Sequence, residues 1–445
     1  MKSLKYIYII FSLALLVSCD DYLEVTPKGE IIPETLEDYE LMLNSNAMTN
    51  LSDPLYAYFS DDIFMDIGSD EVTSDANAYF WRIDLDENAE DPSSIWLSTY
   101  QSQYYANTII NNVMESAAGS DKDKRAVLAE AMTIRAMNYL NLLTVFSKAY
   151  DPKINPEDLG VPLVTSINVT ESIPPRATLN DCFSLITEDL KQAIEWLPAV
   201  QQNRWRVTKY TAAGLLARIY LYIHDYQNAY TYASMALQSS QENKLLDYKS
   251  IEEFPITEQN SEKLWIDKTL IGAQGDGEYY SAELLALFEQ DDLRLSMFTE
   301  RDDDGFTYRT VNRDNAGIGY PEMYLIQAEY FARNGDIEPA MDLVNQIRMN
   351  RFPEGSENMI LEATTKEMTL QVVSEERRRE LCFSGIRWQD MKRLDQEGIM
   401  PVVHRRTQND LESSVIGSLE PSSPNYTFEI PLKVRLVNPN IELNH

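Results

Sequence analysis

The chain has 445 residues, of which 44% are hydrophobic and 24% are charged, so it can bury a large core and disorder over the whole length is not expected. Its 71 acidic residues outnumber 38 basic ones, and the formal net charge of −33 argues against nucleic acid and anionic membrane surfaces as partners. The chain also has 26 Tyr, 14 Phe and 6 Trp, a supply of rings that suits a stacking surface for a ligand.

The first nineteen residues have the pattern of a secretory signal. Two lysines precede an apolar run, residues 6–17, which is too short to cross a bilayer core of about 30 Å. The run ends in Leu-Val-Ser-Cys19, which resembles the bacterial lipobox, whose cysteine receives a diacylglyceryl group. We therefore expect a cleaved signal peptide at residues 1–18, a lipid anchor at Cys19 and one folded domain, residues 19–445, outside the membrane. An ordinary signal peptide with an incidental cysteine is the alternative.

Residues 95–240 are predicted to form the first set of helical repeats. Between residues 125 and 148, apolar side chains fall on one face of a 3.6-residue period. Arg135 lies within this stripe, where it must either snorkel or meet a carboxylate, because an unpaired buried charge is costly. The next helix begins at a capping box formed by Thr178 and Asp181 and ends before a proline.

Two segments have the spacing of the 34-residue tetratricopeptide repeat, in which small residues let paired helices approach and larger ones fill the gap. A glycine at 335 marks the turn inside the second unit. A further helix is predicted from Thr364 to Phe383, and a turn at Gly385 leads into a short helix, so residues 320–396 form the second helical region. The residues at diagnostic places are Leu216, Ala217, Tyr220, Ala229 and Ala236 in the first unit and Tyr324, Ala328, Phe331 and Ala340 in the second.

Two insertions, approximately residues 45–95 and 240–320, are rich in Tyr, Phe, Gly and Asp and lack sustained periodicity. In the C-terminal segment, residues 397–445, an alternation over residues 432–436 predicts a strand. The predicted fold is therefore mainly α, a tetratricopeptide-like helical scaffold with long irregular insertions and few short strands. Insertions on such scaffolds often carry the binding function.

The insertions supply the candidate ligand-binding residues. The first places three rings and a guanidinium together, with Tyr79, Trp81 and Arg82 as candidates, and the second contributes Tyr279 and Tyr280. Flat rings stack on the C–H faces of sugars, while a few well-placed polar groups bind hydroxyls and fix orientation. Burial of these rings in the core is the alternative for each of them.

Other charged and glycine-rich patterns are interpreted as structural. The arginines at 377–379 are flanked by glutamates at helical spacing, and Trp388 is expected in the core. The Asp-Asp-Asp-Gly run at 302–305 lacks the register of an EF-hand and predicts an acidic turn. Glycines at 272, 275 and 277 lack the strand-to-helix context of a phosphate loop and predict a flexible loop.

The reactive side chains point to no catalytic chemistry. Cys182 and Cys382 are expected to be buried thiols, with a single disulfide between them as the alternative. His224, His404 and His445 have no zinc-type spacing, so no metal, cofactor or catalytic residue is predicted. A glycosidase, which needs two placed carboxylates, stays an alternative because 71 acidic residues make such pairs common.

Sequence blocks spread over nearly the whole chain, and in the right order, resemble the SusD/RagB family of outer-membrane nutrient-binding lipoproteins. The most specific block is Glu-Arg-Arg-Arg-Glu-Leu at 376–381, followed by Gly385, Arg387-Trp388 and Asp390. Departures at Cys382, Ser384, Lys433 and Val434 mark a divergent member. The other blocks are Cys19-Asp20-Asp21-Tyr22-Leu23-Glu24 with Pro27, Ala129-Glu130-Ala131 with Arg135-Ala136, residues 178–198, residues 208–220, residues 324–348, and Val437-Asn438-Pro439-Asn440.

This resemblance implies four tetratricopeptide-like helix pairs that back an irregular ligand-binding region. It implies a cell-surface lipoprotein that closes over a SusC-like TonB-dependent transporter barrel and delivers captured oligosaccharides to it without performing chemistry. The RagB-type branch of the family implies a peptide or glycopeptide ligand instead. A tetratricopeptide adaptor that assembles other proteins is the alternative from a different class.

Overall fold

The computed structural model describes residues 33–86, 88, 94–240, 244–256, 259–269, 271, 277–310 and 316–445. The expected signal peptide and the lipid anchor at Cys19 lie outside the described residues, as do Gly272 and Gly275. None of the helices formed by the described residues combines the length and the apolar character that a membrane span requires.

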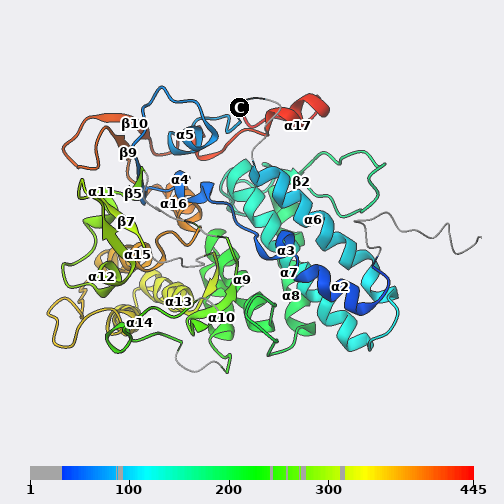
Figure 1. Cartoon of the computed structure of the whole chain (residues 1–445), viewed down its shortest axis with the longest axis horizontal. Helices are drawn as coiled ribbons and strands as arrows, with labels where there is room; N and C mark the ends of the chain where they lie inside the picture. The colour runs from blue at the N-terminus through cyan, green and yellow to red at the C-terminus, as the bar shows by residue number, and fades with distance from the viewer. Residues whose placement is uncertain are drawn as a thin grey trace, which may run out of the picture.

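Consecutive long helices pack side by side and form one half of the molecule (Figure 1). α6 (Ser94–Asn112) contacts α7 (Asp121–Phe146), α7 contacts α8 (Leu179–Trp196), and α8 contacts α9 (Lys209–Tyr222). The second half of α7 is buried on nearly every side, which explains why the polar Arg135 needs a partner there.

The helix starts in this half follow local capping rules. Ser120 precedes α7, where its Oγ accepts a hydrogen bond from the Asp123 N–H at 3.3 Å while the Asp123 carboxylate accepts from the Ser120 N–H at 3.3 Å. Thr178 precedes α8 as its N-cap, and its Oγ1 accepts from the Asp181 N–H at 3.1 Å, so this half of the predicted capping box is confirmed.

The other half of the helical layer continues the same arrangement. α10 (Tyr226–Ala236) contacts α9 and α13 (Tyr320–Asn334), and α13 contacts α14 (Ile337–Arg348) and α15 (Lys366–Leu381). The predicted repeat spacing is confirmed, because the small residues at its diagnostic places are fully buried between these helices. They are Ala217, Ala229, Ala236, Ala328 and Ala340.

Two turns in this half show how single residues set helix ends. Gly335 ends α13 with φ +84°, a left-handed conformation that glycine adopts without a side-chain clash. Thr365, one residue later than predicted, is the N-cap of α15, and its Oγ1 accepts from the Met368 N–H at 3.2 Å. The predicted short helix follows as α16 (Arg387–Gln396).

The described strands pair two at a time, always antiparallel, as β1–β5, β2–β3, β4–β8, β6–β7 and β9–β10. The β1–β5 ribbon joins the two insertions, since Phe64 lies opposite Tyr279 and Ile63 lies opposite Tyr280. The shorter elements are α2 (Leu36–Leu43), α3 (Asn46–Thr49), α4 (Leu55–Phe59), β1 (Ile63–Met65), α5 (Ser74–Tyr79), β2 (Leu159–Pro162), β3 (Arg176–Thr178), β4 (Lys263–Ile266), β5 (Glu278–Tyr280), α11 (Ala282–Leu285), α12 (Leu293–Phe298), β6 (Thr299–Arg301), β7 (Thr307–Arg309), β8 (Gly317–Gly319), β9 (Val403–Arg406), β10 (Val415–Leu419) and α17 (Leu432–Val437).

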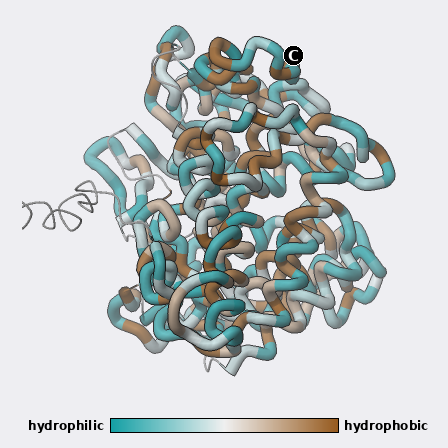
Figure 2. Tube along the Cα trace, turned by 90° about the vertical axis from the view of Figure 1, so that its right-hand side faces the viewer, coloured by the Kyte–Doolittle hydropathy of each residue, from teal (hydrophilic) through white to brown (hydrophobic). Residues whose placement is uncertain are grey.

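One large hydrophobic cluster runs through the helices and into the insertions, and a small one joins α13, α14 and α15 through residues such as Ala332, Val344 and Val373. Figure 2 shows hydrophobic and hydrophilic residues alternating along the helical turns, as expected for helices that bury one face. The prediction of a mainly α fold with few short strands is therefore confirmed, and the division into a single domain stays a prediction.

One predicted element is wrong. Residues 432–437 form the helix α17, not a strand, and Pro431 stands at its N-cap. An alternation over five residues fits a short helix as well as a strand, and no described strand pairs with this segment. Leu436 and Val437 are 64% and 70% exposed, so the alternation marks no buried face.

The two cysteines of the described chain form no disulfide with each other. Cys182 is buried, as predicted, whereas Cys382 at the end of α15 is only half-buried.

Candidate functional site

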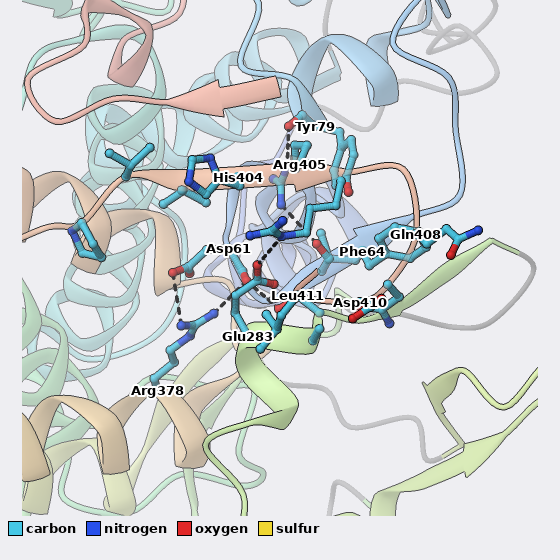
Figure 3. Close-up of a pocket in the computed structure, with 18 residues that line it drawn as sticks. Asp61, Phe64, Tyr79, Glu283, Arg378, His404, Arg405, Gln408, Asp410 and Leu411 are labelled. Carbon is cyan, nitrogen blue, oxygen red and sulfur yellow. Dashed lines mark hydrogen bonds and ion pairs between the residues drawn. The ribbon is translucent and has the colours of Figure 1, made fainter. Parts of the chain in front are cut away.

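A cavity of about 220 Å³ lies where the two insertions meet the C-terminal segment (Figure 3). We call it the insertion cavity. Its walls come from β1 and the turn before it, the end of α5, the start of α11, α15, and β9 with the loop that follows. The lining residues are Asp61, Ile63, Phe64, Tyr79, Ser281, Ala282, Glu283, Arg378, Pro401, Val402, Val403, His404, Arg405, Arg406, Gln408, Asn409, Asp410 and Leu411.

One wall of the insertion cavity is built on Asp61, which two arginines hold. Arg387 Nε and Nη2 donate to the two carboxylate oxygens at 2.7 and 2.8 Å, and Arg378 Nη1 lies 3.4 Å from Oδ2. Burial by itself raises the pKa of Asp61, but the neighbouring guanidinium groups outweigh burial and hold the pKa well below its usual range. Asp61 is therefore a fixed anion at neutral pH, neutralised by its partners.

The back of the insertion cavity is built on Arg405 of β9, which is 2% exposed. Its guanidinium carbon lies 3.9 Å from the ring centroid of Tyr79 and 4.1 Å from that of Trp81. The guanidinium donates to four carbonyl oxygens, those of Tyr58, Ser60, Ile63 and Tyr79, at 2.8 to 3.1 Å. Burial without a paired carboxylate lowers the pKa of Arg405 to about 10, so it stays charged at neutral pH.

The mouth of the insertion cavity carries the polar groups that solvent or a ligand can reach. Arg406 Nε lies 3.4 Å from Glu283 Oε1, and its Nη1 donates to a carbonyl oxygen at 2.8 Å. Gln408 and Asp410 are exposed on the loop after β9, and Leu411 beside them is 44% exposed. In Figure 3 Gln408 and Asp410 lie on one side of the cavity, and His404 and Arg378 lie on the other.

This arrangement suits reversible binding of a polar ligand with an apolar face. Donors and acceptors at the mouth can bind hydroxyl or amide groups, and the apolar walls exclude water from one side of the ligand. Among the described residues, no cluster of three or more His, Cys, Asp or Glu side chains is placed to hold a metal ion.

The structure separates the predicted binding residues. Tyr79 lines the insertion cavity, and Tyr280 adjoins it because its carbonyl accepts from Asn409 Nδ2 at 2.8 Å. Tyr280 turns its ring toward Phe383, with centroids 4.7 Å apart, so the ring does not face the cavity.

Tyr279 belongs to a neighbouring group of rings on the outer part of the insertions. Its centroid lies 6.4 Å from that of Phe64 and 4.9 Å from that of Phe306. A hydrogen bond from its hydroxyl to Asp302 raises the pKa of Tyr279 and lowers that of Asp302. The predicted acidic turn is thus confirmed between β6 and β7, and it helps to hold Tyr279.

Trp81 and Arg82 do not line the insertion cavity. Trp81 is 1% exposed, and its Nε1 donates to the Phe59 carbonyl at 2.8 Å, so both ring faces are covered and none is open to a ligand. Arg82 is half-buried, donates to Asn77 Oδ1 at 2.8 Å and to the Ser69 carbonyl at 2.7 Å, and lies over the Phe80 ring. Of the two interpretations offered for Trp81, burial in the core fits the structure better than ligand stacking.

The structural interpretation of the arginine run is confirmed, with one glutamate partner from the same helix and two aspartate partners from other segments. Arg377 pairs with Asp390 at 2.8 Å, Arg378 pairs with Asp62 at 2.8 Å, and Arg379 pairs with Glu376 at 2.9 Å. Only the last of these pairs lies within one helix. Trp388 is fully buried, as predicted.

Sequence reasoning missed the residues that make most of the insertion cavity, above all Arg405 and Arg406. The signal was the alternation of Val403, His404, Arg405 and Arg406, whose burial alternates as in a half-buried strand. An arginine at a buried strand position is unusual and marks a site where several carbonyl groups converge.

Two family models and several known proteins match this chain. A family model described as "Starch-binding associating with outer membrane" matches residues 21–221, and a model described as "SusD family" matches residues 219–441. SusD-like protein P2 of Formosa agariphila is 26% identical over 479 residues, which cover 88% of this chain and 91% of that protein. SusD-like protein P25 of the same organism is 25% identical over 279 residues, which cover 58% of this chain and 50% of P25.

Solved structures agree on the fold. A putative sugar binding protein from Bacteroides vulgatus is similar with a TM-score of 0.74 and 24% identity, covering 93% of this chain and 99% of that one. A SusD superfamily protein from Bacteroides thetaiotaomicron is similar with a TM-score of 0.76 and 21% identity, covering 92% of this chain and 100% of that one. At such identities the similarity shows a common fold.

Proposed function

The chain belongs to the SusD/RagB family, and we propose that it is a cell-surface lipoprotein that captures oligosaccharides and delivers them to a SusC-like TonB-dependent outer-membrane transporter. The observation that carries this proposal is the match of two family models, one after the other, over residues 21–441. The protein binds and transfers its ligand and performs no reaction on it. Cys19 carries the acyl chains that hold it at the outer membrane.

The insertion cavity is the proposed place of capture. Gln408 and Asp410 supply a donor and acceptors on an exposed loop, and Glu283 and Arg406 supply a second pair across the mouth. Leu411, which is 44% exposed, supplies apolar surface for the C–H face of a sugar ring, and the buried Tyr79 forms part of the wall. These are the few convergent polar groups and the apolar wall that a saccharide site requires.

The five residues predicted from the sequence fit this proposal to different degrees. Tyr79 contributes as a buried part of the wall, because it is 1% exposed and the Arg405 guanidinium lies over its ring. Tyr279 contributes through the ring group beside the cavity. Trp81 acts indirectly, because it covers one side of the Arg405 guanidinium. The ligand-binding roles of Arg82 and Tyr280 stay predictions.

The test is ligand binding by the Gln408→Ala/Asp410→Ala double variant, after a glycan array and a peptide panel have identified a ligand. Loss of two polar contacts at about 0.5–1.5 kcal/mol each lowers affinity about 5-fold to 150-fold. Glu412→Ala is the matched control, because Glu412 is exposed on the same loop and does not line the cavity. Unchanged affinity in the double variant contradicts this site, and binding of peptides alone contradicts the oligosaccharide assignment.

Delivery and anchoring need separate measurements. Affinity purification from the native organism should recover a large outer-membrane barrel together with this chain, and its absence contradicts the transporter partnership and favours an adaptor role. Wild-type protein should incorporate radiolabelled palmitate, whereas Cys19→Ala should not. Equal labelling of the two contradicts the anchor.

A further inference from the structure

A second cavity, of about 690 Å³, adjoins the insertion cavity. We call it the helix cavity, because most of its walls come from α13, α15, α16 and the segment that follows α16. The insertion cavity, at about 220 Å³, is smaller than the roughly 300–1,000 Å³ of most ligand pockets, whereas the helix cavity lies within that range. Most of the room for an extended ligand is therefore outside the insertion cavity.

One wall is common to the two cavities and consists of consecutive residues. Ile399, Met400 and Pro401 line the helix cavity, and Pro401, Val402 and Val403 line the insertion cavity. Ile399, Pro401 and Val402 are exposed. The run from 399 to 403 therefore lays a continuous apolar edge along both cavities, and contiguous exposed apolar surface is typical of binding grooves.

The facing wall is one face of α15. Gln371, Ser374 and Arg378 line the helix cavity, and their spacing of three and four residues places them on the same side of the helix. Gln371 and Ser374 are exposed, so their amide and hydroxyl groups are open to a ligand. The helix cavity thus has a polar wall on α15 and an apolar edge opposite it.

Arg378 lies where the two cavities meet. It lines both of them, as Pro401 does. Its Nε donates to Asp62 Oδ1 at 2.8 Å and its Nη2 donates to the Asp61 carbonyl at 2.7 Å, so the guanidinium is fixed without a ligand. In Figure 3 Arg378 lies on the side of the insertion cavity opposite Gln408. The helix cavity therefore adjoins the insertion cavity on the side away from the loop after β9.

The charges of the helix cavity are balanced. Each of the four arginines among its described lining residues has a carboxylate partner at 2.7 to 2.8 Å. Glu367 and Glu375 line the cavity on α15, where Glu375 accepts from Gln371 Nε2 at 2.9 Å. The lining therefore offers hydrogen-bonding groups and apolar surface without an excess of positive charge, which suits an uncharged ligand. The four pairs are Arg333–Glu397, Arg378–Asp62, Arg387–Asp61 and Arg393–Glu329.

We propose that the helix cavity and the insertion cavity form one continuous binding site, which selects uncharged oligosaccharides long enough to occupy both. One end of the oligosaccharide binds the loop after β9, and the following sugar units pass between Arg378 and Pro401. The remaining units lie along α15, where Gln371 and Ser374 bind hydroxyl groups. The saccharide character of the ligand rests on the proposed function, whereas the selection for length rests on the size and the common walls of the cavities.

The test is calorimetric titration of the mature chain with four series of oligosaccharides of two to eight sugar units. Malto-, cello- and xylo-oligosaccharides are uncharged, and oligogalacturonates are acidic. An uncharged series that binds should gain about 10-fold or more in affinity from its shortest to its longest bound member, because the longer members add polar contacts in the helix cavity.

Ser374→Trp should remove this gain and leave the affinity for the shortest bound member unchanged, because an indole ring at this exposed position occupies the helix cavity. Met368→Trp is the matched control, since Met368 is exposed on the same helix and lines neither cavity. If Ser374→Trp does not fold, Gln371→Ala decides, and it should weaken the binding of the longer members only.

The outcomes separate this proposal from the proposed function. An uncharged series that binds without a gain from length overturns the proposal and leaves the proposed function standing, as does a gain that the variants on α15 do not change. Binding of oligogalacturonates alone contradicts the uncharged ligand. Unchanged binding of every member by Gln408→Ala/Asp410→Ala contradicts both the continuous site and the insertion cavity as the place of capture. If none of the four series binds, the proposal is overturned, and the glycan array and the peptide panel decide the proposed function separately.

Discussion

Replacing Arg405 by methionine should destabilise the protein by about 3 kcal/mol. The substitution keeps most of the side-chain volume and removes the donors to four carbonyl groups. Hydrogen bonds from a charged donor are worth about 1.5 kcal/mol each at the low end, or about 6 kcal/mol together. Burial lowers the pKa of Arg405 to about 10, which corresponds to a penalty of about 3 kcal/mol on the charged form that methionine does not incur.

The assay is urea unfolding of Arg405→Met and of Arg406→Met, its neighbour on β9. Arg406 is half-buried and its ion pair with Glu283 is long, at 3.4 Å, so its loss should cost less than about 1 kcal/mol. Ligand affinity of Arg405→Met should fall as well, because the backbone around Tyr79 loses its support. A difference of less than 1 kcal/mol between Arg405→Met and wild type would refute the reasoning that Arg405 holds the insertion cavity together.

Three further changes probe other parts of the fold. Asp189→Asn breaks the buried ion pair with Arg135, in which Arg135 Nε lies 2.7 Å from Asp189 Oδ2, and should lower the free energy of urea unfolding by about 3–5 kcal/mol. The control Asp181→Asn, at the exposed start of α8, should lower it less. Burial lowers the pKa of Lys392 to about 7, whereas the ordinary value of about 10.5 holds in the unfolded chain. Between these pH values the unfolded state binds more protons, so the stability of wild type should rise from pH 7 to pH 10 relative to that of Lys392→Met. A flat or falling difference between the two proteins in unfolding curves contradicts this. Gly335→Ala forces φ +84° on a residue with a side chain and should lower the free energy of unfolding by about 1 kcal/mol, whereas Asn334→Ala should leave it nearly unchanged.

The helical scaffold was predictable because its signals are local. Periodicity, caps and small residues at repeat spacing act within one or two helices, and a carboxylate partner was one of the two outcomes anticipated for Arg135. The exact cap of α15 was missed by one residue because two threonines stand side by side and either can serve. The alternation at α17 was misread because a short alternation does not distinguish a strand from a helix turn.

The insertion cavity was only partly predictable because its contacts are long-range. Arg405 meets the carbonyl of Tyr79 across 326 residues, and Arg378 meets that of Asp61 across 317. No spacing rule links such positions. The clustering of Tyr79 and Trp81 located the right region, but composition alone did not show that an arginine from the C-terminal segment covers the Trp81 ring.

The position of Arg405 near the end of the chain affects the order in which the fold is completed as the chain is synthesised. Residues 58–79 are synthesised early, but the Arg405 guanidinium that donates to their carbonyl groups is synthesised only near the end of the polypeptide. The helices that precede residue 397 can form before that point, whereas the walls of the insertion cavity are complete only afterwards. A chain that ended before residue 405 would lack the guanidinium that joins the first insertion to β9.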